Sequence, residues 1–169
     1  AEAAYRILKA GPTAGSIGPP THLDVKVALG ADSVSFRGLP GHHFQISIQQ
    51  GLEGLPKFDD ITHTAFSEGW GLYSAFLGKE MGFYQDPYRY FGRLTGEIWR
   101  AIRLVVGTGI HAQGCTEAQA IDYAFTNSPR PGPTVRSEAQ RYFNMLAQAT
   151  AHKVAMLEIQ RIRAKAEGL

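Results

Sequence analysis

The alternation of apolar and polar residues predicts two long helices in the middle of the chain. Between about Ile61 and Met81, apolar side chains recur at spacings of three and four, which places them on one face of a helix; they are Phe66, Trp70, Tyr73, Leu77 and Met81. Asp86 and Pro87 form a helix start, because an N-cap residue precedes a proline in the first turn. The helix that they open is expected to continue through Val106.

The segment before these helices has a less regular pattern. Phe44, Ile46 and Ile48 lie two apart, a spacing that suits a strand as well as a helix. Pro40 fits a first helical turn and Gly51 a helix end, so a short helix over residues 41–51 is favoured. The three apolar side chains are expected to supply its packing contacts.

Glycines interrupt the second long helix near its end. Gly107 and Gly109 are expected to stop it and to form a bend that carries His111. Loops braced by helices are common positions for functional groups, so His111 is a candidate substrate contact. A histidine with a purely structural role fits the pattern equally well.

The C-terminal third is predicted to contain a short helix and one long helix. Thr116 and Gln119 stand three apart, as in a capping box, and predict a helix that runs to Phe125. A proline-rich loop follows at residues 128–133, and a single helix is expected from about Ser137 to Ala166.

These segments divide the chain into two parts. Residues 1–37 are rich in Gly, Pro and Ser and form an irregular leader, with one alternating stretch at residues 23–29 that fits a short strand. Residues 38–169 form an all-α domain of about five helices.

Composition narrows the class of protein. A chain of 169 residues with 44% hydrophobic residues can bury one substantial core. A formal net charge of +2, without a basic cluster, does not indicate nucleic-acid binding. No apolar run reaches the roughly 18 residues of a membrane span, and the single cysteine, Cys115, excludes an internal disulfide. Because the chain begins at Ala1 without a methionine, we expect a processed product or a fragment.

Six motifs, taken in order, carry a resemblance to a known family. They are Pro40-Gly-His-His-Phe-Gln45, Thr64-Ala-Phe-Ser-Glu-Gly-Trp-Gly-Leu-Tyr73, Glu80-Met-Gly-Phe-Tyr-Gln-Asp-Pro-Tyr88, Glu97-Ile-Trp-Arg-Ala-Ile-Arg-Leu-Val-Val106, Thr108-Gly-Ile-His111 and Glu117-Ala-Gln-Ala-Ile121. Together they resemble the C-terminal part of the bacterial domain-of-unknown-function 885 proteins, over about residues 38–167. The resemblance implies a helical zinc metallopeptidase plan, similar to thermostable carboxypeptidases and oligopeptidases. Members of the family are much longer than this chain.

The resemblance implies a metal centre whose first part is missing here. The family carries a His-Glu pair where this chain has Phe36-Arg37, so the first zinc ligand and the water-activating carboxylate are absent. His42, or else His43, matches the second ligand of the family, and Glu68 matches the third. Such a centre would bind zinc weakly, because catalytic zinc normally keeps three protein ligands.

Other candidate side chains lie on the later helices. Arg103, three residues after Arg100, could hold a carboxylate, either of a substrate or of a nearby glutamate. Tyr142 on the last helix could stabilise an oxyanion, as a phenol does in related folds, and is equally a candidate core aromatic. Together with Glu68 and His111, these residues form the expected catalytic set.

Three functions agree with these patterns. The first is a metal-dependent hydrolase of amide or ester bonds, acting on a peptide or small molecule. The second is a non-catalytic helical domain derived from such an enzyme, which binds a peptide or partner in the former cleft. The third is a glycoside hydrolase that pairs Glu68 with Glu97 or Asp60. Either the bacterial cytoplasm or the cell envelope suits the chain, and exposed apolar faces are expected to favour a homo-oligomer.

Overall fold

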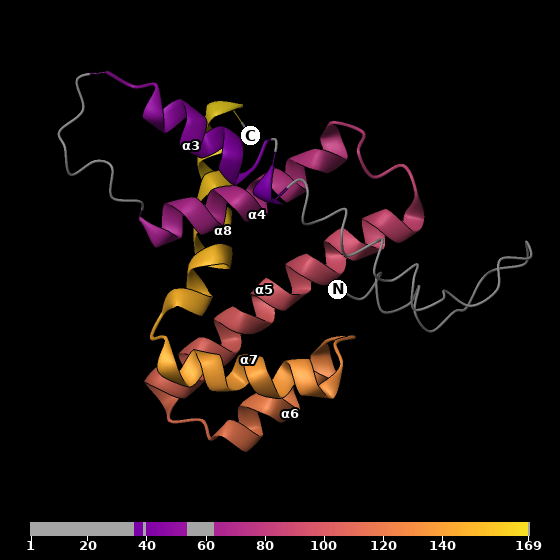
Figure 1. The fold of residues 1–169 in the computed structure, drawn as a ribbon, viewed down its shortest axis with the longest axis vertical. Helices are drawn as coiled ribbons and strands as arrows, with labels where there is room; N and C mark the ends of the chain where they lie inside the picture. The colour runs from indigo at the N-terminus through magenta and orange to yellow at the C-terminus, as the bar shows by residue number, and fades with distance from the viewer. Residues whose placement is uncertain (1–35, 39, 54–62, 169) are drawn as a thin grey trace, which may run out of the picture.

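The computed structural model describes residues 36–38, 40–53 and 63–168, and within these ranges it contains six helices and no strand (Figure 1). The all-α prediction is therefore confirmed, with one helix more than expected. The helices are α3 (His42–Gln50), α4 (Thr64–Glu80), α5 (Pro87–Gln113), α6 (Glu117–Asn127), α7 (Gly132–Asn144) and α8 (Gln148–Ala166).

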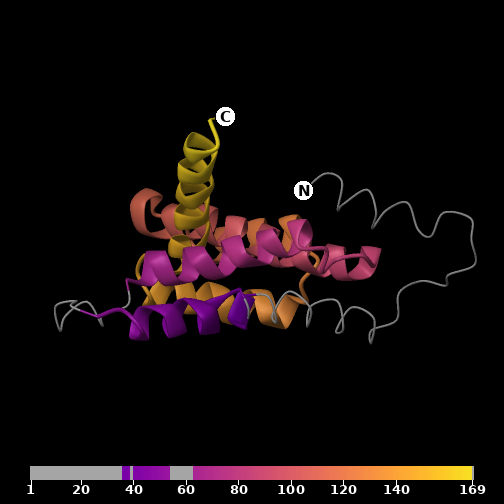
Figure 2. The same ribbon diagram turned by 90° about the horizontal axis from the view of Figure 1, so that it is seen from above.

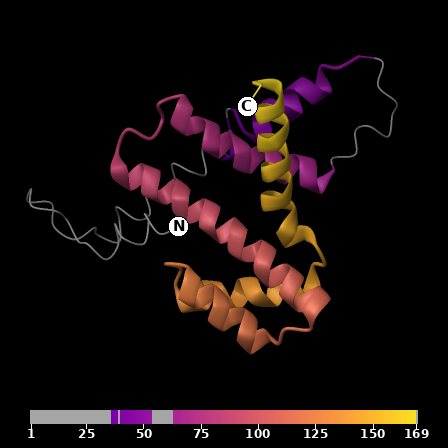
Figure 3. The same cartoon turned by 180° about the vertical axis from the view of Figure 1, so that it is seen from behind.

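The longest helix, α5, connects two groups of helices. At one end α6 and α7 pack against each other, and at the other end α3 lies on α4 (Figures 1 and 3). α8 starts beside α7 and crosses α4, with which it makes the most extensive contact between any two of the described helices. Seen from above, its C-terminal half projects from the layers formed by the other helices (Figure 2).

The buried side chains form two clusters. The larger one joins α5, α6, α7 and the start of α8, and consists of Trp99, Ile102, Val106, Ile110, Ala120, Ala124, Val135, Tyr142 and Ala149. The smaller one lies between α4 and α8 and consists of Phe36, Leu72, Tyr73 and Met156. The candidate site lies beside this second cluster.

The prediction that glycines end α5 near residue 107 is wrong. The helix continues for seven residues beyond Val106, because Gly107 and Gly109 serve close packing instead of a turn. A Cβ at Gly107 would come within 3.0 Å of Thr150, and one at Gly109 within 3.1 Å of the Cys115 sulfur. The helix ends instead at Gly114, whose φ of 69° is the left-handed conformation that glycine accommodates.

The single C-terminal helix predicted from Ser137 to Ala166 is in fact two helices. α7 begins earlier, at Gly132, with a proline in its first turn. The chain breaks after Asn144, and Ala147 adopts a φ of 64°, which turns the backbone before α8 starts at Gln148. The capping box predicted at the start of α6 is confirmed, since Thr116 and Gln119 bond reciprocally.

Residues 41–51 form a helix as favoured, but its packing differs from the expectation. α3 contacts α4 through Gln45, which is buried and donates from Nε2 to the Phe66 carbonyl at 3.4 Å. The apolar Phe44, Ile46 and Ile48 are instead 40%, 42% and 50% exposed. A spacing of two places Ile46 about 200° around the helix from Phe44 and from Ile48, so the three cannot all lie on its buried face.

Some expectations concern other parts of the chain. The strand at residues 23–29, nearly all of the leader and Asp60 lie outside the described residues. Among the residues that are described, no helix is long and apolar enough to cross a membrane.

Candidate functional site

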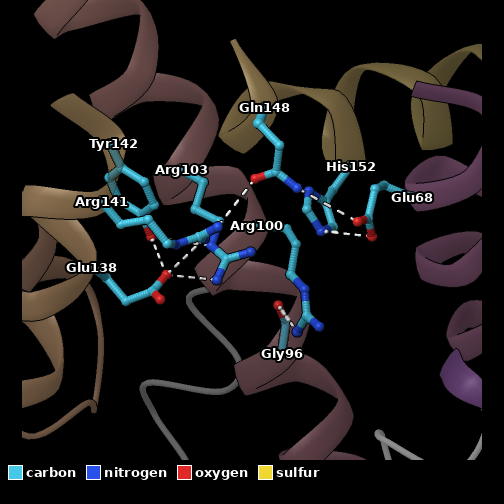
Figure 4. A network of polar contacts seen from close by, with 9 residues as sticks. All are labelled: Glu68, Gly96, Arg100, Arg103, Glu138, Arg141, Tyr142, Gln148 and His152. Carbon is cyan, nitrogen blue, oxygen red and sulfur yellow. Dashed lines mark hydrogen bonds and ion pairs between the residues drawn. The ribbon is translucent and has the colours of Figure 1, made fainter. Parts of the chain in front are cut away.

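Three helices bring polar side chains together around Glu68. The carboxylate lies in the second turn of α4, and its Oε2 atom is 3.0 Å from Nε2 of His152 on α8. Nε2 of His42, the first residue of α3, lies 3.7 Å from the same oxygen. Gln148, at the start of α8, donates from Nε2 to the other carboxylate oxygen at 3.5 Å (Figure 4).

Small residues next to Glu68 explain why these helices approach so closely. A Cβ at Gly69 would lie 2.4 Å from the Cβ of Ala155, so α4 and α8 nearly touch there. A Cβ at Gly71 would lie 2.7 Å from the His42 ring. The glycines of the Glu68-Gly-Trp-Gly71 motif therefore make room for α8 on one side and for His42 on the other.

The protonation states of Glu68 and His152 follow from their surroundings. The hydrogen bond from His152 lowers the pKa of Glu68, against the opposing effect of burial, and the His42 and Arg100 charges act in the same direction. His152 is only 4% exposed, and burial lowers its pKa even though Glu68 favours its charged form. At neutral pH the pair is thus a carboxylate that accepts a hydrogen bond from a neutral imidazole.

Phe36 stands where the resemblance implies the first metal ligand of the family. Its ring is 7% exposed and packs edge-on against His42, with ring centroids 4.8 Å apart, and stacks on His152 at 6.2 Å. The guanidinium of Arg100, on α5, lies 4.8 Å from the centroid of the Phe36 ring. An apolar ring therefore fills the space next to both imidazoles, where the resemblance implies a metal ligand.

The described side chains do not fit a resident zinc ion in this arrangement. A metal-bound histidine normally donates its second ring N–H to an acceptor, but among the described residues Nδ1 of His42 and of His152 has no hydrogen-bond partner. In the same part of the chain, no group of three or more His, Cys, Asp or Glu side chains is placed to hold a metal ion. The zinc site with His42, His43 and Glu68 stays a prediction.

A second polar cluster surrounds Glu138 on α7. Its Oε2 atom accepts hydrogen bonds from Arg103 at 2.6 Å, from the Tyr142 hydroxyl at 2.8 Å and from Arg141 at 3.1 Å. Burial alone would raise the pKa of Glu138, but Arg103, Arg141 and Tyr142 lower it to about 2. Burial raises the pKa of Tyr142 to about 12, so its hydroxyl stays protonated.

Gln148 joins the two clusters. Its Oε1 atom accepts from Arg141 at 3.1 Å while its Nε2 atom donates to Glu68 (Figure 4). Of the expected catalytic residues, Arg103 and Tyr142 therefore belong to the Glu138 cluster and reach Glu68 only through this connection.

Two of the predicted histidines lie apart from Glu68. His111 is in the last turn of α5 rather than on a bend, and its Nε2 atom is 2.8 Å from the carbonyl oxygen of Tyr142 near the end of α7. That contact satisfies one of the carbonyls that a helix end leaves unbonded. His43 is exposed on α3, one residue and about 100° around the helix from His42.

Glu97, proposed as the second carboxylate of a glycosidase pair, forms ion pairs with two basic side chains. It pairs with Arg93 on its own helix and with Lys153 of α8 at 2.7 Å. These partners lower its pKa in spite of burial, so it is an unsuitable proton donor at neutral pH. Its role in this structure is to tie α5 to α8.

The sequence interpretation missed His152 and Glu138. His152 lies in Ala149-Thr-Ala-His152, where no spacing to another ligand indicated its role. Glu138 stands four residues before Tyr142, a spacing that places both on one face of a helix and could have indicated the contact.

Comparisons with known proteins agree with this architecture. The model of a family described as "Bacterial protein of unknown function (DUF885)" matches residues 35–168. The fold is similar to the crystal structure of a protein from Colwellia psychrerythraea described as a "putative lipoprotein", with a TM-score of 0.79 and 36% sequence identity. That similarity covers 81% of this chain and 24% of the relative, so the chain spans about a quarter of its length. No curated protein matches the sequence. Because the family model matches most of this chain, the chain belongs to the DUF885 family of bacterial proteins of unknown function.

Proposed function

We propose that this chain is a non-catalytic helical binding domain that retains the plan of a metal-dependent hydrolase. The observation that carries the proposal is the Phe36 ring, which lies against His42 and His152. It takes the place of a metal ligand, and the neighbouring Arg37 cannot accept a proton from water because its guanidinium stays charged.

The polar groups around Glu68 supply the binding capacity. The Glu68 carboxylate is partly exposed and charged at neutral pH, and the partly exposed imidazole of His42 lies beside it. This chemistry suits the amide and terminal groups of a peptide or a similar small molecule. Localisation in the bacterial cytoplasm or cell envelope fits the proposal equally.

A metal-dependent hydrolase of amide or ester bonds is the second candidate. The observation that favours it is the approach of two imidazole Nε2 atoms, from His42 and His152, to one oxygen of Glu68. Two histidines and one carboxylate are a common donor set for catalytic zinc. Because the described side chains are not placed to hold an ion in this arrangement, this candidate requires them to rearrange around it.

Metal and activity measurements on the purified chain separate the two candidates. Under the binding proposal, the chain retains no stoichiometric zinc after dialysis and hydrolyses neither fluorogenic peptides nor p-nitrophenyl esters when zinc is added. Zinc-dependent hydrolysis that disappears in Glu68→Gln would overturn the proposal and support the hydrolase.

A double substitution tests whether Phe36 and Arg37 are the reason why the chain neither binds zinc nor hydrolyses these substrates under the binding proposal. Replacing Phe36 by His and Arg37 by Glu restores the pair that the family carries, so zinc affinity should rise at least about tenfold. The matched control is Phe36→His alone, which adds a ligand without the carboxylate and should gain metal but no hydrolysis. Binding itself is measured on the ring NMR signals of His42 and His152, with a set of tripeptides as probes. Unchanged signals at millimolar peptide would contradict the binding role.

A further inference from the structure

Three helices hold the ring of Phe36 from three sides. The His42 imidazole of α3 meets it edge-on, with ring centroids 4.8 Å apart, and the His152 imidazole of α8 stacks on it at 6.2 Å with 22° between the ring planes. The Arg100 guanidinium of α5 lies 4.8 Å from its centroid. Each of these contacts uses the π system of the ring, so an aliphatic side chain of the same volume would make none of them.

The backbone of α4 closes the space around the ring at Gly71. A Cβ at Gly71 would lie 3.0 Å from Cζ of Phe36 and 2.7 Å from the His42 ring, so only glycine leaves room there. Cζ is the terminal atom of the ring and its nearest atom to this position, so a hydroxyl group on Cζ would be directed at α4. The space therefore fits a phenyl ring better than a phenol. We call it the phenyl pocket, bounded by His42, Gly71, Arg100 and His152.

The phenyl pocket adjoins the Glu68 site. His42 and His152 line the pocket with their rings, and their Nε2 atoms lie 3.7 Å and 3.0 Å from the Glu68 carboxylate. We propose that the phenyl pocket binds the phenylalanine side chain of a peptide ligand, and that Phe36 fills it while no ligand is bound. The inference rests on the proposed binding function, because the peptide backbone beside that ring would lie at Glu68.

The chain is attached to α4 at a point between Phe36 and α3. The carbonyl oxygen of Pro40 accepts hydrogen bonds from Nε1 of Trp70 at 2.9 Å and from the Ser74 hydroxyl at 3.2 Å. These bonds hold the start of α3, and with it His42, on α4 when Phe36 leaves. The pocket therefore keeps its walls when one ring replaces the other, and the ligand regains the π contacts that Phe36 loses.

Phe36 competes with the ligand because it belongs to the same chain. A tethered group acts at an effective concentration of millimolar order, which a ligand ring has to overcome. The apparent affinity of the wild type is accordingly reduced to the fraction of molecules in which the pocket is open. Removing the Phe36 ring removes this competition, so the affinity for a phenylalanine peptide should rise at least about tenfold.

Calorimetric titration of the full chain with matched tripeptides tests the pocket. The central residue is phenylalanine, tyrosine or cyclohexylalanine between two alanines, and cyclohexylalanine has a ring of similar size without a π system. Phe36→Ala should bind the phenylalanine peptide at least about tenfold more tightly than the wild type does, and at least about fivefold more tightly than the other two peptides. The matched control, Leu72→Ala, removes another buried side chain of the same cluster and should keep the affinities of the wild type.

Trialanine separates the pocket from the binding function of Glu68, because it has no ring. If Phe36→Ala prefers the phenylalanine peptide neither to trialanine nor to the cyclohexylalanine peptide, or if Leu72→Ala gains as much affinity, the phenyl pocket is refuted although peptides bind. If no peptide binds to the wild type or to any variant, the binding function itself is refuted. Far-ultraviolet circular dichroism verifies folding, and Phe36→Leu, which keeps an apolar side chain, should show the same order of preference with a smaller gain.

Discussion

The Glu138 cluster offers the sharpest test of the energetics in this fold. Glu138→Gln keeps the shape of the side chain but removes the charge that compensates Arg103 and Arg141. The pKa of Glu138 falls from an ordinary 4.5 to about 2 in the folded protein. At roughly 1.4 kcal/mol per pH unit, this difference corresponds to about 3 kcal/mol of stability at neutral pH. We therefore expect Glu138→Gln to destabilise the chain by about 2–3 kcal/mol.

Thermal and urea unfolding at pH 7 measure the effect. For a domain of this size the loss corresponds to a fall in Tm of roughly 5–10 °C. The matched control is Glu158→Gln, which removes the carboxylate from an exposed ion pair with Arg161 on α8. Its Tm should stay within experimental error of the wild type, since exposed ion pairs contribute little.

The stability difference between the wild type and Glu138→Gln should change with pH in a defined direction. A carboxyl group whose pKa is lowered by folding contributes its stability fully above the unfolded pKa near 4.5, and loses it as the pH falls through about 2. The gap between wild type and Glu138→Gln should therefore be constant from pH 7 to about pH 5 and then narrow. A gap that is below 1 kcal/mol at pH 7, or that widens on acidification, would refute the assignment of Glu138 as the stabilising anion.

Three further predictions concern the helix junctions and the site. Ala147→Gly should stabilise the chain by about 0.5–1 kcal/mol in urea unfolding, because glycine tolerates the left-handed backbone between α7 and α8 better than alanine; a loss of stability would show that the turn is not strained. Gly69→Ala should cost more than about 2 kcal/mol in the same assay, since its Cβ would lie 2.4 Å from that of Ala155; unchanged stability would contradict the close approach of α4 and α8. The ring signals of His152 in NMR should titrate below the ordinary value of 6.5, so the stability that its neutral form provides is present above pH 6.5 and lost as the pH falls through its folded pKa. A His152 that titrates above 6.5 would instead indicate that its attraction to Glu68 exceeds the cost of burial.

The helices that carry regular patterns could be located from the sequence. The apolar spacing placed α4 within a few residues, the signal at Asp86 placed the start of α5, and the Thr116 capping box was recognised with its partner. These signals are local, because a cap or a hydrophobic face depends on residues a few positions apart.

The errors arose where a contact between distant residues decides the local structure. Gly107 resembles a helix stop, but it faces Thr150 of α8 inside a continuing helix. The break at Ala147 leaves no sequence signal, because alanine is a strong helix former that seldom adopts a positive φ.

The candidate site was predictable in part for the same reason. Glu68 was identified, and the structure places it next to His42. The approach of His152 depends on how α8 crosses α4, which a single sequence does not encode locally. The ion pairs of Arg103 and Glu97 likewise join helices that are far apart along the chain.

The glycines next to Glu68 have a consequence for how this locus can change over evolutionary time. Gly69 and Gly71 set the distances between α4, α8 and His42 by backbone approach, whatever side chains stand at the site. Exchanging Phe36 or His152 for another residue of similar volume therefore alters the chemistry without removing the contacts that bring the helices together. The backbone arrangement of α4, α8 and His42 is therefore expected to tolerate such exchanges. It is for that reason a suitable starting point for installing new chemistry by design.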